Sequence, residues 1–169
     1  MPRKRTERLS SEQARRIAEE CYGEVLAYCR RHAPVGHEPA DLAQETFLRF
    51  VRAGSYHERG KPIAYLMRIA RSVCIDASRR RRLETVSLDF DLPTMEQGES
   101  DIELKEALAK LPGDLREAVE LRYGTGLDVS EVAKVLGISR FSVRRRINAA
   151  LRLLEKELGE GDLDGQGRP

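Results

Sequence analysis

The stretch from Asp128 to Ile147, DVSEVAKVLGISRFSVRRRI, constrains the fold more than any other part of the chain. It opens with Asp128 and Glu131, a D-x-x-E pair that is typical of a helix capping box. A short apolar segment follows and stops at Gly137, because a left-handed backbone position that ends a helix suits glycine. Ser139 can then cap a second helix. The pattern predicts two short helices joined by a tight turn, the arrangement of a helix-turn-helix.

A helix-turn-helix also needs small and apolar residues where its two helices cross. The stretch supplies Ala133, Gly137, Ile138, Val143 and Ile147. If Val143 and Ile147 face inward, a step of about 100° per residue turns the opposite side of the second helix outward. That side carries Phe141, Arg144, Arg145 and Asn148. Because Arg and Asn form paired hydrogen bonds with guanine and adenine edges, we predict a DNA-reading helix; the alternative is an ordinary helical hairpin with a solvated basic face.

Charge divides the rest of the chain into blocks. Residues 61–82 hold seven Lys or Arg against one Asp, and residues 130–158 hold seven against three acidic residues. Between these blocks, residues 83–103 carry seven Asp or Glu and no Lys or Arg. That acidic segment has no sustained helical period and contains Pro93 and Gly98, as a linker does. We therefore expect an all-α protein with two small helical domains joined by a flexible acidic linker.

The expected divisions are a basic extension at 1–10, a helical domain at 11–82, the linker at 83–100, a four-helix domain with the helix-turn-helix at 101–158, and a disordered tail at 159–169. In the first domain, three or four helices are expected. Ser10 or Ser11 caps one with a buried row of Ile17, Cys21, Val25 and Tyr28, and others begin near Pro39 and at Pro62. In the second domain, one helix carries the apolar residues Ile102, Leu104, Leu108 and Leu111, and Pro112 starts the next.

Several function classes are disfavoured. The chain has no apolar run near the roughly 20 residues of a membrane helix, and no apolar region follows its basic N-terminus, so we expect a cytoplasmic protein. Cys29, His32 and His37 match no common zinc spacing. Without a nucleophile–base pair or a phosphate-binding loop, we expect no enzyme, no cofactor, no metal and no small-molecule substrate.

Three segments, taken in order, resemble an extracytoplasmic-function (ECF) sigma factor, the smallest class of the bacterial primary-sigma family. DLAQETFLRFVRA (41–53) is similar to the helix that docks on the clamp of the largest RNA polymerase subunit. KPIAYLMRIARSVCIDASRRRR (61–82) resembles the segment that opens the −10 element, and residues 107–154 resemble the −35-reading domain. The resemblance covers roughly residues 11–82 and 101–158.

The resemblance implies roles for particular residues. The polar face of residues 41–53 carries Asp41, Gln44, Glu45, Thr46 and Arg49. Of these, the expected polymerase contacts are Asp41, Gln44, Glu45 and Arg49. The −35 element is expected to meet Ser139, Arg140, Phe141, Arg144, Arg145 and Asn148. A melted −10 strand can be held by charge and stacking, for which the candidates are Tyr56, Tyr65, Arg68, Arg71, Ser72, Arg79 and Arg80. Tyr65 equally suits core packing, and the family commonly has Trp at that position, Asn at Ser72 and a basic residue at Ala149.

The implied partners are core RNA polymerase, promoter DNA and an anti-sigma factor, with the free protein a monomer. The implied location is the cytoplasm, at the nucleoid when active or at the membrane when an anti-sigma factor holds it there. The alternative is a free-standing helix-turn-helix regulator in which residues 1–82 form a dimerisation domain. Copurification with core polymerase separates the two, because a sigma factor binds it stoichiometrically.

Overall fold

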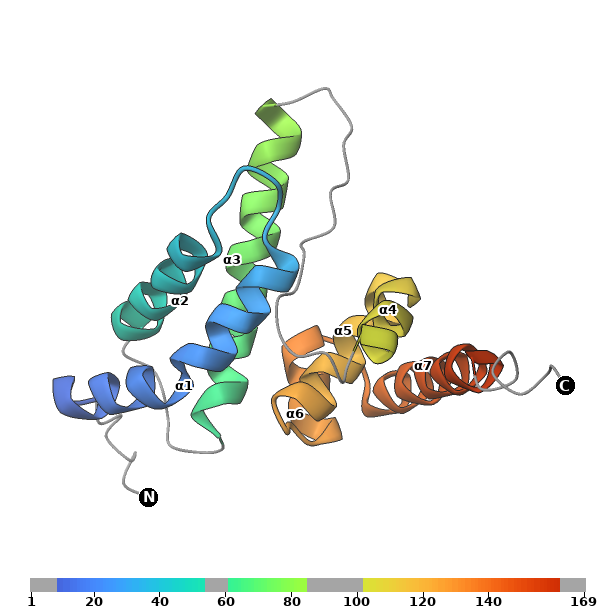
Figure 1. Cartoon of the computed structure of the whole chain (residues 1–169). Coiled ribbons are helices and arrows are strands. Elements are labelled where there is room, and N and C mark those ends of the chain that lie inside the picture. The colour runs from blue at the N-terminus through green and yellow to red at the C-terminus, as the bar shows by residue number, and fades with distance from the viewer. Residues whose placement is uncertain (1–8, 54–60, 85–101, 162–169) are drawn as a thin grey trace, which may run out of the picture. The chain divides into compact units, whose positions relative to one another are not determined.

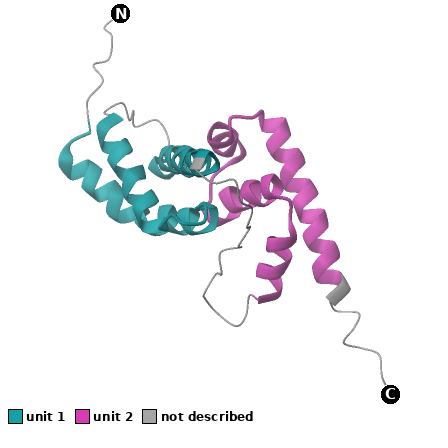
Figure 2. Ribbon diagram, turned by 90° about the horizontal axis from the view of Figure 1, so that it is seen from above, with its two compact units in different colours: residues 1–95 teal, residues 96–169 magenta. Residues whose placement is uncertain are grey.

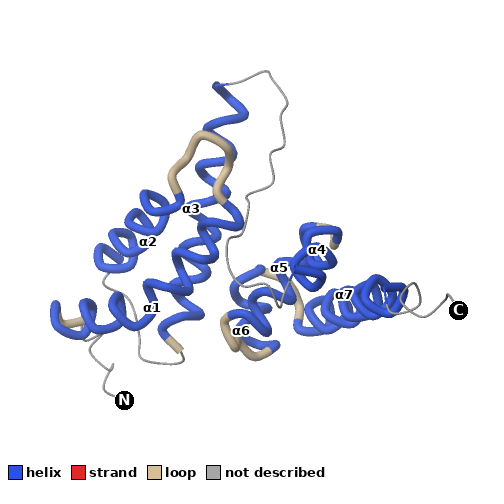
Figure 3. Tube along the Cα trace, viewed as in Figure 1, coloured by secondary structure: helices blue, strands red, loops and turns tan. Residues whose placement is uncertain are grey.

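The computed structural model describes residues 9–53, 61–84 and 102–161. Within these ranges the secondary structure is helical, and no strand occurs (Figure 3). The chain divides into two compact units, residues 1–95 and 96–169 (Figure 2). The prediction of an all-α protein with two helical domains is therefore confirmed. Most of the acidic segment, and Tyr56, lie outside the described residues.

Three helices make up the described part of the N-terminal unit: α1 (Ser11–His32), α2 (Pro39–Ala53) and α3 (Pro62–Glu84), each packed against the other two (Figure 1). Ser10, not Ser11, caps α1. Its Oγ accepts a hydrogen bond from the Gln13 backbone N–H at 3.2 Å, while Gln13 Oε1 accepts one from the Ser10 N–H at 3.0 Å. This reciprocal pair satisfies two backbone donors that the first turn would otherwise leave open.

The core of this unit lies where the three helices meet. Its buried side chains are Val25, Tyr28 and Cys29 of α1; Leu42, Ala43, Thr46 and Phe50 of α2; and Leu66, Met67, Ala70, Val73, Cys74 and Ala77 of α3. Burying each of the large apolar ones stabilises the fold by about 1.5–3 kcal/mol relative to exposure. The predicted row on α1 is only partly right, because Ile17 and Cys21 are half-buried.

Thr46 corrects the predicted polar face of α2. The expectation that it lies on the exposed face is wrong, since its side chain is fully buried. Its Oγ1 donates to the Leu42 carbonyl oxygen at 2.8 Å, one helical turn earlier. That bond satisfies the hydroxyl without water, so threonine fits among apolar neighbours.

The C-terminal unit contains α4 (Ile102–Lys110), α5 (Gly113–Val119), the π-helical turn η2 (Glu120–Gly124), α6 (Val129–Leu136) and α7 (Arg140–Gly161). Helix α7 packs against α4, α5 and α6 (Figure 1). One buried cluster joins α4, α5 and α7 through Ala107, Leu111, Val119, Ala150 and Leu154. Helix α7 extends three residues beyond the domain end predicted at 158.

Ile102 and Leu104 do not belong to the core of this unit. Both side chains are exposed, at 53% and 41%, while Ala107 and Leu111 are buried. Helix α4 has nine residues, and its buried contacts with α7 are made by its second half. No helix in the described part of the chain is both long and apolar enough to cross a membrane.

Candidate nucleic-acid interface and docking face

The helix-turn-helix is held by three local devices, all of them predicted. Asp128 Oδ1 accepts from the Glu131 backbone N–H, and Glu131 Oε2 accepts from the Asp128 N–H, each at 2.8 Å. Gly137 ends α6 with a φ of 67°, which is left-handed. Ser139 Oγ accepts from the Ser142 backbone N–H at 3.1 Å at the start of α7. These contacts fix where each helix begins and ends, and so fix the turn between them.

Buried side chains set the rotation of α7 about its own axis. Val143 and Ile147 of α7 are 0% and 7% exposed, and Val132, Val135 and Leu136 of α6 are equally buried. Because two helices that interlock in this way cannot rotate freely, the opposite side of α7 is held toward solvent.

The outward side of α7 carries the residues predicted to read DNA: Ser139, Arg140, Phe141, Arg144, Arg145 and Asn148 are all exposed. The structure thus brings the six together at the N-terminal end of one helix, where recognition helices contact base edges. In the described part of the chain, neither Arg144 nor Arg145 forms a salt bridge, so both guanidinium groups are available to a ligand.

Arg146 differs from the two arginines before it. It is half-buried, and its Nε lies 3.5 Å from Asp114 Oδ2 at the start of α5. The step of about 100° per residue that leaves Arg146 out of the predicted DNA-reading residues turns it back toward α5. Arg146 therefore helps to position α7 and is not part of its outward face.

The candidate −10 residues on α3 separate into two groups. Arg68, Ser72, Arg79 and Arg80 are exposed. Residues four and seven positions apart lie on the same side of a helix, so Arg68, Ser72 and Arg79 form a row along α3. Arg80 lies on a different side of the helix, one residue beyond Arg79. Arg71 and Tyr65 are half-buried.

Tyr65 makes the core contact that the sequence left open. Its ring centroid is 6.0 Å from that of Phe50 on α2, and the two planes are inclined by 60°. This distance and tilt are typical of aromatic pairs in protein cores. Tyr65 is thus partly committed to holding α2 against α3, although one side of it remains accessible.

On α2, the four predicted polymerase contacts also separate. Asp41 and Gln44 are exposed, while Glu45 and Arg49 are half-buried. Arg49 Nε lies 2.8 Å from Glu45 Oε1, and Arg49 Nη1 lies 2.9 Å from Asp76 Oδ2 on α3. Hydrogen bonds to Glu45 and Asp76 raise the pKa of the Arg49 guanidinium above its ordinary value. Arg49 therefore bridges two helices.

Two apolar residues on the same face were not predicted. Leu48 and Val51 are 43% and 59% exposed, and they follow Asp41 and Gln44 at spacings of four and three residues. The signal was available in the sequence, because positions 41, 44, 48 and 51 share one side of a helix. Exposed apolar side chains beside a carboxylate and an amide suit a protein-binding surface.

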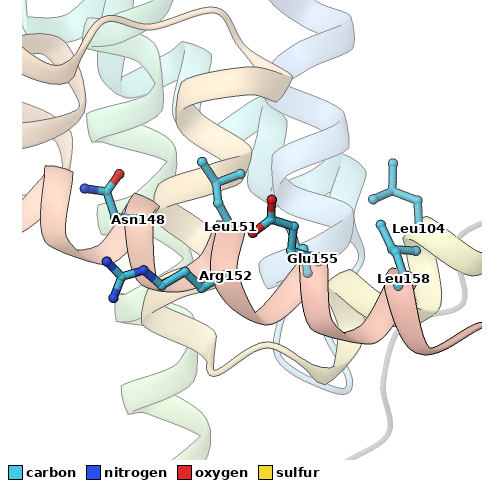
Figure 4. A pocket seen from close by; sticks show the side chains of 8 residues that line it. Leu104, Asn148, Leu151, Arg152, Glu155 and Leu158 are labelled. Atoms are coloured by element: carbon cyan, nitrogen blue, oxygen red, sulfur yellow. The ribbon is translucent and has the colours of Figure 1, made fainter.

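A groove between α4 and α7 was also not predicted. It has a volume of about 870 Å³ and is lined by Leu104, Asn148, Leu151, Arg152, Leu154, Glu155, Leu158 and Gly159. Leu104 and Leu158 lie at one end of it and Asn148 at the other (Figure 4). Asn148 thus belongs both to the outward face of α7 and to this groove.

Two of the three cysteines belong to the N-terminal core. Cys29 and Cys74 are buried, and a hydrogen bond between their side chains lowers the pKa of the Cys29 thiol, against the opposing effect of burial. Burial raises the pKa of the half-buried Cys21 thiol. In the residues that the structure describes, no three His, Cys, Asp or Glu side chains gather as metal ligands would.

Comparisons with known proteins agree with this geometry. The family model for Sigma-70 region 2 matches residues 17–84, and that for Sigma-70 region 4 matches residues 101–154. The chain is 31% identical to the ferric citrate uptake sigma factor FecI of Escherichia coli, covering 77% of this chain and 82% of FecI. It is 32% identical to the RNA polymerase sigma factor CarQ of Myxococcus xanthus, over 83% and 86% of the two chains. It is 33% identical to the ECF RNA polymerase sigma factor SigE of Mycolicibacterium smegmatis, over 73% of this chain, but spans about half of SigE, 53%.

Two solved structures share the fold. The first is the sigma factor RpoE in complex with the anti-sigma factor NepR from Bartonella quintana, with a TM-score of 0.71 at 20% identity, over 86% of this chain and 96% of that one. The second is CnrH in complex with the cytosolic domain of CnrY, with a TM-score of 0.58 at 24% identity, over 94% and 92%.

Proposed function

Because this chain belongs to the sigma-70 family, in its extracytoplasmic-function group, we propose that it binds core RNA polymerase and directs transcription from specific promoters. One observation carries the proposal. In one unit α7 turns Arg144, Arg145 and Asn148 outward, and in the other unit α2 has a face with the exposed apolar residues Leu48 and Val51. A free-standing regulator would need the first face as well, but would use the second only to bind another copy of itself, and copurification with core polymerase separates the two.

The α7 face is assigned to the −35 element. Arg144, Arg145 and Asn148 supply the donors and acceptors that pair with guanine and adenine edges in the major groove. Ser139 and Arg140, at the start of the helix, are assigned to the phosphate backbone, for which a helix N-terminus and a cation are both favourable. Phosphate contacts fix the register, and base contacts supply the sequence preference.

The exposed row on α3, Arg68, Ser72 and Arg79, is assigned to the −10 element. The two cations in this row, Arg68 and Arg79, can bind successive phosphates of one strand, as the positively charged grooves of single-strand-binding proteins do. Tyr65 serves mainly as a packing residue, so base capture depends less on it than the resemblance implied. Tyr56 stays a candidate for stacking on an unpaired base.

Docking on polymerase is assigned to Asp41, Gln44, Leu48 and Val51 of α2. Apolar contacts at the centre with polar groups beside them are the usual composition of a protein interface. Arg49 contributes by position, because its ion pair with Asp76 holds α2 against α3, and Glu45 pairs with the same guanidinium from within α2.

We extend the proposal to a regulatory partner. The two solved structures described above are the sigma factor RpoE in complex with the anti-sigma factor NepR, and CnrH in complex with the cytosolic domain of CnrY. By analogy, the free protein is a monomer in the cytoplasm that an anti-sigma factor keeps from polymerase, and it joins the nucleoid once released.

The direct test is run-off transcription with core polymerase over a library of fragments from the source genome. The proposal requires defined transcripts that appear only when this protein is added. Stoichiometric copurification with core polymerase should accompany them. A protein that binds DNA as a dimer, does not copurify with core and yields no transcript would instead be a free-standing regulator.

A further inference from the structure

Phe141 stands out on the α7 face. Its side chain is 74% exposed, the highest value of any large apolar side chain in the described part of the C-terminal unit. Among the described residues, Phe141 has neither a stacking partner nor a cation over its ring. Single exposed apolar residues are common on protein surfaces, but Phe141 lies among the residues predicted to read DNA, where a bound duplex would cover it and recover part of the roughly 1.5–3 kcal/mol that burial of a phenylalanine contributes.

Its position on the helix is that of a base-contacting residue. Phe141 is the second residue of α7, directly after the turn fixed by Gly137 and Ser139. At about 100° per residue, Arg145 and Asn148 lie within about 40° of the same line along the helix. Val143 and Ile147 anchor the opposite side, so this line is the outermost part of α7.

The chemistry of Phe141 restricts what it can recognise there. A phenyl ring has no donor or acceptor, so it cannot distinguish bases by hydrogen bonding. The major groove offers one strongly apolar group, the C5-methyl of thymine, and phenylalanine is among the side chains that contact it. The neighbouring arginines and Asn148 already provide polar contacts to guanine and adenine.

We propose that Phe141 is a specificity-determining residue that packs on the C5-methyl group of one thymine in the −35 element. The inference rests on the proposed function and deepens it, since it names the chemical group that one residue reads. It adds discrimination against cytosine, and against uracil, both of which lack the methyl group.

Deoxyuridine substitution isolates this contact, because it removes the methyl group and leaves the Watson–Crick edge and the charge unchanged. The promoter is first identified by run-off transcription with the holoenzyme. Each thymine of its −35 element is then replaced in turn, and binding of the duplex by holoenzyme is measured for the native protein, for Phe141→Ala and for Leu153→Ala. Leu153 is a matched control: it is an exposed apolar residue on α7, 41% accessible, about 120° from Phe141 around the helix.

We expect one thymine at which deoxyuridine weakens binding about fourfold in the native protein, the effect of burying one methyl group. The effect should disappear in Phe141→Ala and persist in Leu153→Ala, which is the nonadditivity expected of residues in contact. Circular dichroism verifies that both variants keep native helix content.

Three results would overturn the inference while leaving the proposed function intact: a −35 element without thymine, deoxyuridine that is neutral everywhere, or an equal deoxyuridine effect in Phe141→Ala. A loss of binding in Phe141→Ala without any deoxyuridine effect would indicate a wedge between base steps instead. A holoenzyme that selects no promoter at all would refute the proposed function, and this inference with it.

Discussion

Removing the carboxylate of Asp76 should weaken the attachment of α2 to α3. Asp76 Oδ2 lies 2.9 Å from Arg49 Nη1. The Nε atom of the same guanidinium lies 2.8 Å from Glu45 Oε1. The two side chains of the interhelical pair are 31% and 36% exposed. They are therefore neither fully screened by water nor fully removed from it.

The expected magnitude lies between two limits. Exposed ion pairs contribute about 0.2–1 kcal/mol, whereas breaking a fully buried pair costs about 3–5 kcal/mol. With about a third of each side chain exposed, we expect a coupling free energy between Arg49 and Asp76 of about 1 kcal/mol. For a domain of this size, a loss of 1 kcal/mol lowers the melting temperature by about 4–8 °C.

The assay is a double-mutant cycle with Arg49→Ala, Asp76→Ala and the combined variant, followed by urea unfolding and far-ultraviolet circular dichroism. The C-terminal unit is the same in all four proteins, so its contribution cancels in the cycle. Arg15 and Glu19 on α1 form a control pair, since their Nε–Oε1 distance is also 2.8 Å but they are 80% and 64% exposed. The coupling should be clearly larger for Arg49–Asp76 than for the control, and should fall when salt is raised to 1 M. Equal couplings in the two pairs would refute the reasoning.

Three further predictions concern DNA reading, the turn and the linker. Arg144→Ala or Arg145→Ala should weaken promoter binding by about 1–3 kcal/mol and relax the sequence preference at one base pair. If binding instead falls equally for all promoter variants and depends less on salt, the arginine contacts a phosphate and not a base. Gly137→Ala should lower the unfolding free energy by roughly 1–2 kcal/mol in thermal melts, because the backbone there has a φ of 67°, and an unchanged melting temperature would contradict this. Replacing the seven acidic residues of 83–103 by Gln or Asn should increase non-specific DNA binding by the free protein and reduce initiation by holoenzyme, both at low salt; if neither changes, the segment is a tether only.

Features that depend on a few neighbouring residues were predictable from the sequence. The capping box at Asp128, the left-handed Gly137 and the Ser139 cap are all within four residues of the backbone groups they satisfy. Pro39 and Pro62 begin α2 and α3 as expected, because proline suits the first turn of a helix. These signals were enough to place the recognition helix and its outward face.

Features that depend on which helices pack together were not predictable. Arg49 looked like a free cation on a polar face, but its partner Asp76 is 27 residues away on another helix. The helical step already set Arg146 apart from Arg144 and Arg145, but its partner Asp114, 3.5 Å away on α5, depends on the tertiary packing. Thr46 looked polar, yet packing of α2 buries it completely. In each case the residue type was compatible with either environment, and only the tertiary arrangement decided between them.

The central claim is that one chain joins a polymerase-docking face on α2 to a DNA-reading face on α7. It is tested most directly by measuring core polymerase affinity and promoter selection side by side for two double variants. Asp41→Ala with Gln44→Ala should lower affinity for core polymerase about tenfold and leave promoter preference unchanged once holoenzyme is formed at saturating protein. Arg144→Ala with Arg145→Ala should leave core affinity unchanged and abolish the preference for the native −35 sequence. The account is contradicted if the α2 variant binds core as tightly as the native protein, or if the α7 variant still selects the native promoter.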